Sequence, residues 1–498
     1  MAFPFFPEQA TVSQASGLDR RTFLRLAASG AMFLGATAWG AGRLAFAAKP
    51  QDQGCSQGDP GSFTANPPGQ AGSFLLFSDA HFDPFADPAK VKALAAAPAG
   101  EWRAILSDGA KAPFSPYGQD SNNALFQSFL DDMAGAAPRP DFLLYPGDLL
   151  CHRFWTQYPK LTGDLTPQGL LGFITKTAEY FLTEVTRRFP GVPLYLALGN
   201  NDSFEGDFAL APRSPYLSAT APLVAKLCLK DDAARAPFLK SYPQYGCYAA
   251  PLPGPGGARL VVYTDIFWAK RSPHQEAGKP VLEFLERELA QAKQQGQKVW
   301  LMAHMPPGDN TKASASKLLK KGKDVYKPLL LDAFNSALAA LLVKYADTIR
   351  ASFAGHVHRD EFRLVFPSPG ALPAASMRLA PSISPVTGNN PGYQIFTYDR
   401  SSLELLDMST RYLDLGAPDP AWALEYTYSR TYGRGLRAAK DWQEMYQELL
   451  TCPQRREAFS EGFDLRSAHI REVTERTFPL VWESLGLSAS SPNALYQG

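Results

Sequence analysis

The chain has 498 residues, of which 45% are apolar and 19% are charged, and its formal net charge is +1. This is the composition of a globular protein, and it excludes a collagen-like, coiled-coil or disordered chain. A net charge so close to zero gives no reason to expect nucleic acid as a partner, and we predict no nucleic-acid binding.

Residues 1–47 have the pattern of an export signal. Arg20 and Arg21 precede a Gly- and Ala-rich apolar run over residues 26–42, and small residues follow at 45–47. This pattern is typical of a bacterial twin-arginine signal, so we predict passage through the twin-arginine export machinery and a periplasmic or secreted protein. The alternative is an uncleaved anchor, but the run is short and Gly-rich for a span of ~20 apolar residues. We predict no stable membrane span.

Residues 48–72 are rich in Gly, Pro, Gln and Ser and are predicted to be a linker. Short apolar runs follow, at residues 74–77, 142–145, 194–197, 260–263, 299–302 and 351–353, and helical patterns lie between them at 169–188 and 279–295. Near-continuous apolar runs are typical of strands buried on both faces. Their alternation with helices predicts an α/β fold with a layered sheet.

We assign residues 73–410 to a catalytic domain and residues 411–498 to a helical C-terminal subdomain. The second assignment depends on segments 421–431, 439–450 and 455–475, which we predict to be amphipathic helices. The five cysteines are too widely spaced for a zinc finger, and Cys228 with Cys247 could close a loop in an oxidising compartment.

Five short polar segments follow the apolar runs, and they supply a set of metal-binding side chain types. In chain order these are Asp79, His81, Asp148, Asn200, His304, His356 and His358. Polar groups at the carboxyl ends of strands lie where α/β sheets build their sites. Two divalent metals about 3.5–4 Å apart can hold both the attacking and the leaving oxygen at phosphorus, and such a pair needs one bridging carboxylate. Asp148 is the natural bridge.

Each segment alone is ambiguous, because Asp-x-His is more often a surface turn and a single His after a strand is usually structural. The prediction depends on the ordered set. Four of the seven histidines fall on these strand ends, and a fifth, His152, lies four residues after Asp148.

The order Asp-x-His, Gly-Asp, Gly-Asn-x-Asp, His, Gly-His-x-His resembles that of the calcineurin-like metallophosphoesterases. Segments 147–152, 304–308 and 355–362 are similar to motifs of the acid sphingomyelinase branch, and the resemblance covers roughly residues 73–460. It implies a layered α/β/β/α metallophosphoesterase sandwich.

The resemblance also implies a ligand set for two divalent metal ions. One ion would be bound by Asp79, His81, Asp148 and His358, and the other by Asp148, Asn200, His304 and His356. Zn²⁺ is implied first, with Mn²⁺ or Fe as alternatives, because a set of His, Asp and Asn ligands does not choose between them.

One position departs from the family pattern. The family usually has His after the metal-binding Asn, whereas this chain has Asn201, which can donate a hydrogen bond but cannot transfer a proton. Fungal endopolyphosphatases are similar in carrying Gly-Asn-Asn-Asp. We expect Asn201 to stabilise charge on the phosphoryl oxygens and His152 to protonate the leaving group, with a supporting role at the metal site as the alternative for His152.

The predicted function is acid sphingomyelinase-like hydrolysis of a phosphodiester by a hydroxide that bridges the two metals. The alternatives are an endopolyphosphatase or nucleotide phosphoanhydride hydrolase and, from another class, a non-catalytic phosphoryl-binding protein. The phosphoester substrate would be a lipid head group, a nucleotide or polyphosphate. The Lys-rich run at 317–327 could attract polyanions or be a solvated loop. Trp155, Phe267 and Trp268 could line a substrate pocket or lie in the core.

Overall fold

The computed structural model describes residues 70–107, 113–252, 257–322, 325–437 and 439–489. The predicted signal and nearly all of the predicted linker lie outside these described residues. No helix within the described ranges is long and apolar enough to cross a membrane. Cys228 and Cys247 are buried free thiols, so the loop closure considered for them is wrong.

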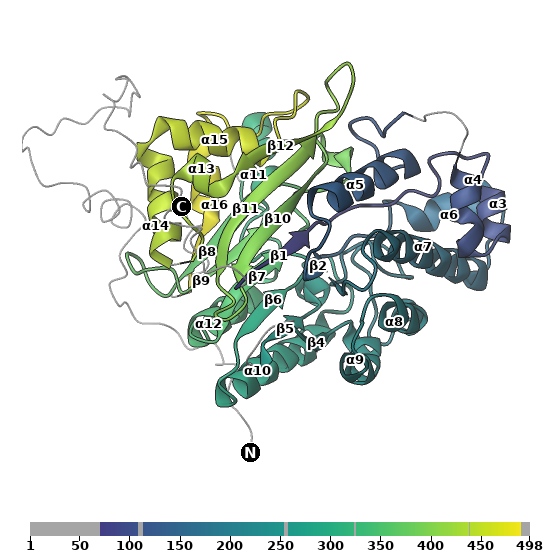
Figure 1. The fold of residues 1–498 in the computed structure, drawn as a ribbon, viewed down its shortest axis with the longest axis horizontal. Coiled ribbons are helices and arrows are strands. Elements are labelled where there is room, and N and C mark those ends of the chain that lie inside the picture. Colours follow the sequence, from purple (N-terminus) through teal and green to yellow (C-terminus); the bar gives the residue numbers. More distant parts are fainter. Residues whose placement is uncertain (1–69, 108–112, 253–256, 323–324, 438, 490–498) are drawn as a thin grey trace, which may run out of the picture.

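Two mixed β-sheets form the centre of the molecule (Figure 1). The first has the order β12-β11-β10-β1-β2-β3, with β1, β2 and β3 parallel and the others antiparallel. Its strands are β1 (Ala71–Leu76), β2 (Phe142–Tyr145), β3 (Leu194–Leu196), β10 (Gly392–Asp399), β11 (Leu405–Leu413) and β12 (Trp422–Thr427).

The second sheet has the order β13-β8-β9-β7-β6-β5-β4, and its central strands β5, β6, β7 and β9 are parallel. Its strands are β4 (Tyr248–Pro251), β5 (Arg259–Val262), β6 (Val299–Met302), β7 (Ile349–Ala354), β8 (Glu361–Phe366), β9 (Ala375–Leu379) and β13 (Gly486–Ser488).

Aromatic rings fill the space between the sheets. The ring of Phe74 on β1 lies 5.0 Å from Trp300 on β6 and 5.5 Å from Phe353 on β7, and Phe142 on β2 lies 5.6 Å from Trp300. All four side chains are fully buried. Such pairs contribute about 0.5–1.5 kcal/mol each beyond their buried area. The inner faces of the two sheets therefore share one core.

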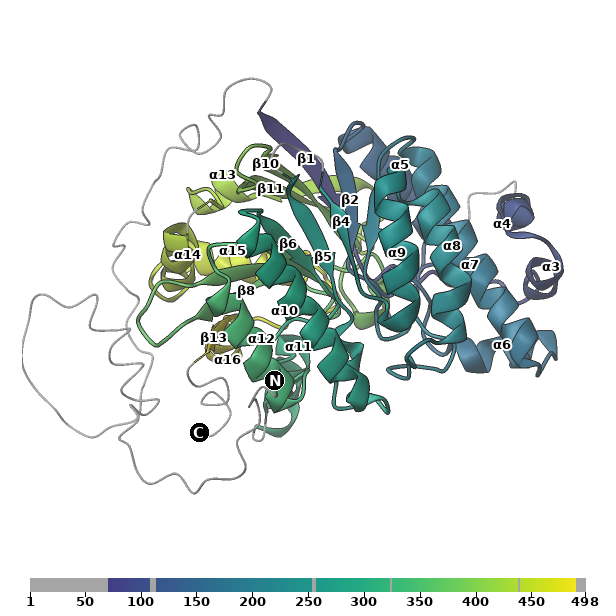
Figure 2. The ribbon, with the colours of Figure 1, turned by 90° about the horizontal axis from the view of Figure 1, so that it is seen from below.

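Helices cover the outer faces of both sheets (Figure 2). Tyr145 of β2 packs on Phe181 of α7 at 5.3 Å, and Phe77 packs on Phe129 of α5 at 5.8 Å. Helices α10 and α12 lie over the second sheet. The helices are α3 (Val91–Ala96), α4 (Trp102–Leu106), α5 (Asn123–Ala136), α6 (Phe154–Thr162), α7 (Pro167–Arg188), α8 (Pro215–Leu227), α9 (Asp232–Tyr245), α10 (Gly278–Gln294), α11 (Thr311–Lys321), α12 (Asp332–Lys344), α13 (Tyr428–Tyr432), α14 (Ala439–Thr451), α15 (Pro453–Phe463) and α16 (Phe478–Leu485).

This arrangement confirms the predicted α/β/β/α sandwich. Each of the six apolar runs falls on a strand, and α7 and α10 coincide with the two predicted helices to within two residues. The helical C-terminal part lies on the side of the molecule opposite α3–α7 in both views (Figures 1 and 2).

The predicted helix at residues 421–431 is wrong in its first half, because Trp422–Thr427 is strand β12. It pairs antiparallel with β11, and these backbone hydrogen bonds override the helix preference of its Ala, Leu and Glu residues. Trp422 donates to the hydroxyl of Ser128 and packs on Tyr393. The pattern that resembled an amphipathic helix is therefore that of an edge strand.

The predicted helix at residues 455–475 is too long. Helix α15 ends at Phe463, and Leu465 and Arg466 have φ of 55° and 53°, a left-handed conformation that a right-handed helix cannot contain. The predicted boundary at 410/411 falls inside β11, and β13 joins the second sheet. The C-terminal part thus adds strands to both sheets as well as helices.

Arg359 joins the C-terminal part to the loop that carries the last predicted ligands. Its guanidinium is fully buried, and its Nε lies 2.8 Å from Asp464 Oδ1 and 2.9 Å from Glu472 Oε2. We expect Arg359→Met to lower the free energy of unfolding by about 3–5 kcal/mol, because the buried carboxylate of Asp464 and the partly buried one of Glu472 lose their cation. Urea unfolding followed by circular dichroism measures this.

The matched control is Arg139→Met, which removes an exposed arginine and is expected to change the free energy by less than about 0.5 kcal/mol. Equal stability of the two variants would contradict the structural role of Arg359.

Candidate active site

The predicted ligands lie in the loops that follow β1, β2, β3, β6 and β7. Five of the seven have positive φ, between 42° and 68°: Asp79, His81, Asp148, His356 and His358. Side chains other than Gly rarely adopt this conformation, which costs about 1–3 kcal/mol per residue and clusters at functional sites. The surrounding structure therefore holds these loops in a strained conformation.

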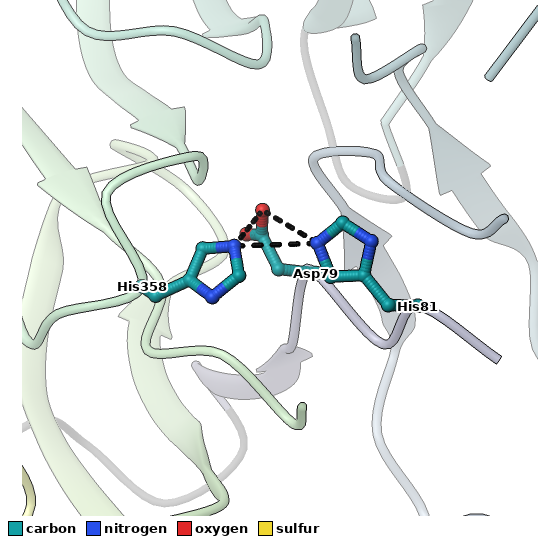
Figure 3. A group of neighbouring side chains, drawn as sticks. All are labelled: Asp79, His81 and His358. Carbon is teal, nitrogen blue, oxygen red and sulfur yellow. Dashed lines mark hydrogen bonds and ion pairs between the residues drawn. The ribbon is translucent and has the colours of Figure 1, made fainter. Parts of the chain in front are cut away.

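One group is formed by Asp79, His81 and His358, whose side chains point toward one another (Figure 3). His81 Nε2 lies 3.3 Å from His358 Nε2 and 4.0 Å from Asp79 Oδ1, and His358 Nε2 lies 3.3 Å from the same carboxylate oxygen. All three are buried. Two imidazole nitrogens and a carboxylate oxygen thus face one point.

The second group is formed by Asp148, His304 and His356, with Asn200 beside them. Asn200 Oδ1 lies 3.1 Å from His304 Nε2 and 2.9 Å from His356 Nδ1. The amide nitrogen of Asn200 donates to Asp207 Oδ1 at 2.8 Å, and this bond turns the amide oxygen toward the histidines. Asp207 has no counterpart among the residues singled out from the sequence.

Asp148, a member of the second group, also lies close to the first. Its Oδ2 lies 3.5 Å from His81 Nε2 and 3.4 Å from His304 Nε2. The structure therefore brings all seven side chains together in two groups, with Asp148 between them.

The tautomers of two histidines suit metal binding. Nδ1 of His81 lies 3.0 Å from the carbonyl oxygen of Leu150, and Nδ1 of His304 lies 3.0 Å from that of Pro146. A carbonyl oxygen only accepts, so each Nδ1 carries a proton. Nε2 of His81 therefore directs a lone pair into the group, and Nε2 of His304 does so once its own proton is lost. The donor atoms present are thus those that a divalent ion requires.

The protonation states of the side chains in the two groups also favour the binding of cations. Burial raises the pKa of Asp148, but the charges of His304 and His81 more than offset this and hold it well below its usual value. Burial, and further the charge of Lys312, lower the pKa of His358 to about 3, so this ligand is neutral. Burial lowers the pKa of His304, yet Asp148 raises it to about 10. A cation binding there would displace a proton.

Asp202 links the loop that follows β2 to the loop that follows β3. Its carboxylate accepts backbone N–H bonds from Asp148 at 2.8 Å, Leu149 at 2.9 Å, Leu150 at 3.1 Å and Gly199 at 2.9 Å. The sequence showed Asp202 only as the last residue of Gly-Asn-x-Asp. Its carboxylate thus fixes the position of the Asp148 backbone.

His152 lies at the edge of the site, with its ring stacked on His81 at 4.3 Å. Its Nδ1 donates to Asp120 Oδ1 at 2.9 Å, and its backbone N–H donates to Asp120 Oδ2 at 2.8 Å. Burial lowers the pKa of His152, but the hydrogen bond and the charge of Asp120 raise it above its usual value. Asp120 follows no apolar run and belongs to no motif that we identified, so the sequence analysis missed it.

Asn201 lies differently from what the sequence led us to expect. Its side chain is 1% exposed, its amide donates to Asp148 Oδ2 at 3.1 Å, and its backbone N–H donates to Asp148 Oδ1 at 2.7 Å. It therefore contacts the carboxylate of Asp148 and does not line the open cavity of the site.

A cavity of about 410 Å³ opens over the two groups. Its lining includes four cationic side chains, those of Lys270, Arg271, Lys312 and Lys327. Burial lowers the pKa of Lys312 to about 8, so its ammonium is cationic at neutral pH. The Lys-rich run thus reaches the site through its last residue, Lys327.

The three aromatic residues considered for a substrate pocket do not line this cavity. Phe267 and Trp268 are fully buried in the core. Trp155 donates its indole N–H to the carbonyl of Ser203.

Comparison with known proteins gives relatives of one kind. An acid sphingomyelinase-like phosphodiesterase 3b from Homo sapiens is 28% identical over 387 residues, which are 73% of this chain and 76% of the relative. A cyclic GMP-AMP phosphodiesterase from Homo sapiens is 28% identical over 388 residues, 74% of this chain and 77% of the relative. Among solved structures, a dimetal phosphatase from Danio rerio aligns with 68% of this chain and 95% of its own, with 11% identity and a TM-score of 0.39.

The model of one protein family, the calcineurin-like phosphoesterases, matches residues 72–360. This match covers more than half of the chain and includes all seven residues of the two groups. The protein therefore belongs to the calcineurin-like phosphoesterases and is a metal-dependent phosphoester hydrolase.

Proposed function

We propose that this protein is an exported phosphodiesterase that uses two divalent metal ions. The observation that carries the proposal is the convergence of two ligand groups on the single carboxylate of Asp148. Two bound ions, Zn²⁺ or alternatively Mn²⁺ or Fe, would supply Lewis-acid polarisation of the phosphoryl group and an activated water. The diester is favoured because relatives that align over three quarters of their length are named phosphodiesterases.

Each ion would have its own set of ligands, and the two sets would share Asp148. Asp79, His81, Asp148 and His358 would bind one ion, and Asp148, Asn200, His304 and His356 the other. Asp207 holds the amide of Asn200 with its oxygen inward. Asn201 holds both oxygens of Asp148 through its backbone and side chain, so we assign it the orientation of the bridging carboxylate.

His152 is the residue that we propose to protonate the leaving alkoxide. It lines the cavity, and Asp120 holds its Nδ1, which leaves Nε2 as the proton donor. The carboxylate of Asp120 stabilises the imidazolium form. Asp120 acts through His152 and is a positioning residue.

The contribution of His152 to catalysis is expected to depend on the leaving group of the substrate. We expect His152→Ala to lower kcat/KM by about 10²–10⁴-fold for a diester with an alkoxide leaving group, because general acid catalysis contributes this much. For bis(p-nitrophenyl) phosphate the loss should stay below about tenfold, since p-nitrophenolate leaves without a proton. Steady-state kinetics on both substrates measures the difference.

His274→Ala is the matched control, because His274 is partly exposed and does not line the cavity. A loss of equal size on both substrates would show that His152 supports the metal site and does not donate the proton.

The activity itself is tested with the metal-loaded protein. We expect turnover of a chromogenic phosphodiester to exceed that of its monoester and to disappear in Asp148→Asn. If neither ester is turned over while two ions are bound, the phosphodiesterase proposal is wrong, and a phosphoanhydride hydrolase or a phosphoryl-binding protein takes its place.

Export by the twin-arginine route is proposed from Arg20, Arg21 and the apolar run that follows them. We expect a host with a working twin-arginine translocase to export the protein with its N-terminus at residue 48, as read by N-terminal sequencing. Equal export from a host that lacks the translocase would contradict this route.

A further inference from the structure

A single buried hydroxyl, that of Tyr145, lies between two of the loops that carry predicted ligands. Tyr145 is the last residue of β2, and its side chain is 1% exposed. Its ring packs on Phe77 and Phe181, whose ring centres lie 5.1 Å and 5.3 Å away. The hydroxyl donates to the carbonyl oxygen of Asp148 at 2.9 Å and accepts the N–H of Ala80 at 3.3 Å. It therefore links the loop after β1 to the loop after β2.

These two loops continue the pairing of β1 with β2 beyond the ends of the strands. The N–H groups on either side of Ala80, those of Asp79 and His81, are donated to backbone carbonyls of the second loop at 3.0 Å each. Ala80 is fully buried, and in the described part of the chain its own N–H has the hydroxyl of Tyr145 as its one partner. A buried N–H without a partner is unfavourable. The hydroxyl therefore takes the place of a backbone acceptor at this point.

The residues on both sides of this contact have an unfavourable backbone conformation. Asp79, His81 and Asp148 have φ of 51°, 42° and 59°. Such conformations persist only where the surrounding structure holds them. Asp148 is held at both of its peptide groups, because Asp202 accepts its N–H at 2.8 Å and its carbonyl oxygen accepts from Tyr145. Loss of the hydroxyl would thus remove a constraint from three strained ligands at once.

The ligands next to this contact belong to one ion in the proposed assignment. The ion assigned to Asp79, His81, Asp148 and His358 is here called the first ion, and the other is called the second ion. His81 Nε2 lies 4.0 Å from Asp79 Oδ1 and 3.5 Å from Asp148 Oδ2. The loss of a group that orients metal ligands typically lowers metal affinity by about 10–100-fold. The hydroxyl of Tyr145 should therefore affect the first ion most.

We propose that Tyr145 is a positioning residue for the first ion, because its hydroxyl fixes the loop of Asp79 and His81 against the backbone of Asp148. The inference rests on the two-ion site of the proposed function. It adds a residue that acts on the ligands through backbone groups. Tyr145 completes an apolar run in which a phenylalanine would pack equally well, so the sequence carries no signal of this role.

Metal binding by Tyr145→Phe tests the proposal, because this variant loses the hydroxyl and keeps the packing of the ring. Zn²⁺ is titrated into the metal-stripped protein and followed by calorimetry, with a chelator of known affinity as the competitor. We expect one of the two ions to bind about 10–100-fold more weakly than in the unchanged protein, and the other to change by less than about threefold.

Tyr248→Phe is the matched control. Tyr248 lies on β4 and is also fully buried, and its hydroxyl accepts the N–H of Leu196 at 3.0 Å and donates to the carbonyl oxygen of Leu196 at 2.9 Å. The two variants thus lose equivalent hydrogen bonds, and Leu196 is not a ligand. We expect the melting temperatures of the two metal-free variants to agree within about 2 °C. The Zn²⁺ affinities of Tyr248→Phe should stay within about threefold of those of the unchanged protein.

Two further variants identify the ion that is weakened. His304→Ala removes a ligand of the second ion, and His358→Ala removes a ligand of the first. We expect the added Tyr145→Phe change to weaken the remaining ion by at least about tenfold in the His304→Ala protein, and by less than about threefold in the His358→Ala protein.

Equal Zn²⁺ affinities of Tyr145→Phe and the unchanged protein, or an equal loss in both tyrosine variants, would overturn the positioning role even if diesters are hydrolysed. An ion weakened at least tenfold in the His358→Ala protein would overturn the assignment to the first ion. If Tyr145→Phe alone loses affinity but the unchanged protein hydrolyses no diester, the proposed function fails and the positioning role stands.

Discussion

Asp148→Asn is expected to lower kcat/KM for a chromogenic phosphodiester by at least about 10³-fold, because Lewis-acid catalysis by metal ions contributes several kcal/mol. Asp148 Oδ2 is the carboxylate oxygen that lies within 3.5 Å of one histidine from each group. An amide keeps the shape of the side chain but carries no negative charge between two cations. We therefore also expect the metal content to fall from two ions per chain to one or fewer, measured by mass spectrometry.

Asp131→Asn provides the matched control. Asp131 lies on α5, its side chain is 66% exposed, and it pairs with Arg188 on the surface. This variant should keep both the rate and the metal content. If Asp148→Asn kept two ions and more than about a tenth of the rate, Asp148 would not be the shared ligand.

Gly199→Ala is expected to damage the site without removing any ligand. A Cβ at this position would lie 2.1 Å from Asp148 Oδ1 and 2.3 Å from Asp148 N, which is closer than atoms can approach. The bridging carboxylate cannot move aside without leaving the two groups. We expect the free energy of unfolding to fall by about 1–3 kcal/mol through overpacking. kcat/KM should fall about 10²-fold, which is typical of a 1 Å displacement.

Chemical unfolding and diester kinetics measure the two effects. Gly135→Ala is the control, since nothing lies within 4 Å of a Cβ there and Ala favours helix α5. A Gly199→Ala protein with full activity would show that the loops carrying Asp148 and Gly199 are not packed as closely as the structure describes.

The metal-binding groups could be found from the sequence because each ligand follows a strand directly. Once runs 142–145 and 194–197 are identified as neighbouring parallel strands, their carboxyl ends lie at one edge of the sheet, and Asp148 and Asn200 come together. In the second sheet, runs 299–302 and 351–353 bring His304 and His356 together in the same way. The apolar runs were informative because both of their faces are buried.

The edge strands and the supporting residues could not be found in this way. Strand β12 lies at the edge of its sheet and has no buried apolar run, with both Ala423 and Leu424 exposed. Its Ala, Leu and Glu residues favour a helix, so the sequence analysis predicted the wrong element there. Asp120 and Lys312 reach the site from a loop and from the first turn of α11, and only the tertiary fold brings them next to His152 and His358. The contact of Asn201 with Asp148 depends on how two loops pack, which no motif specifies.

The most direct test of the two-metal site is a titration of the metal-stripped protein with Zn²⁺ or Mn²⁺, in which bound metal and the rate of diester hydrolysis are measured together. We predict two ions bound per chain, a rate that rises only as the second ion binds, and no rate in Asp148→Asn. A full rate with one ion per chain, or a rate that does not depend on added metal, would contradict the assignment of the seven ligands to two ions.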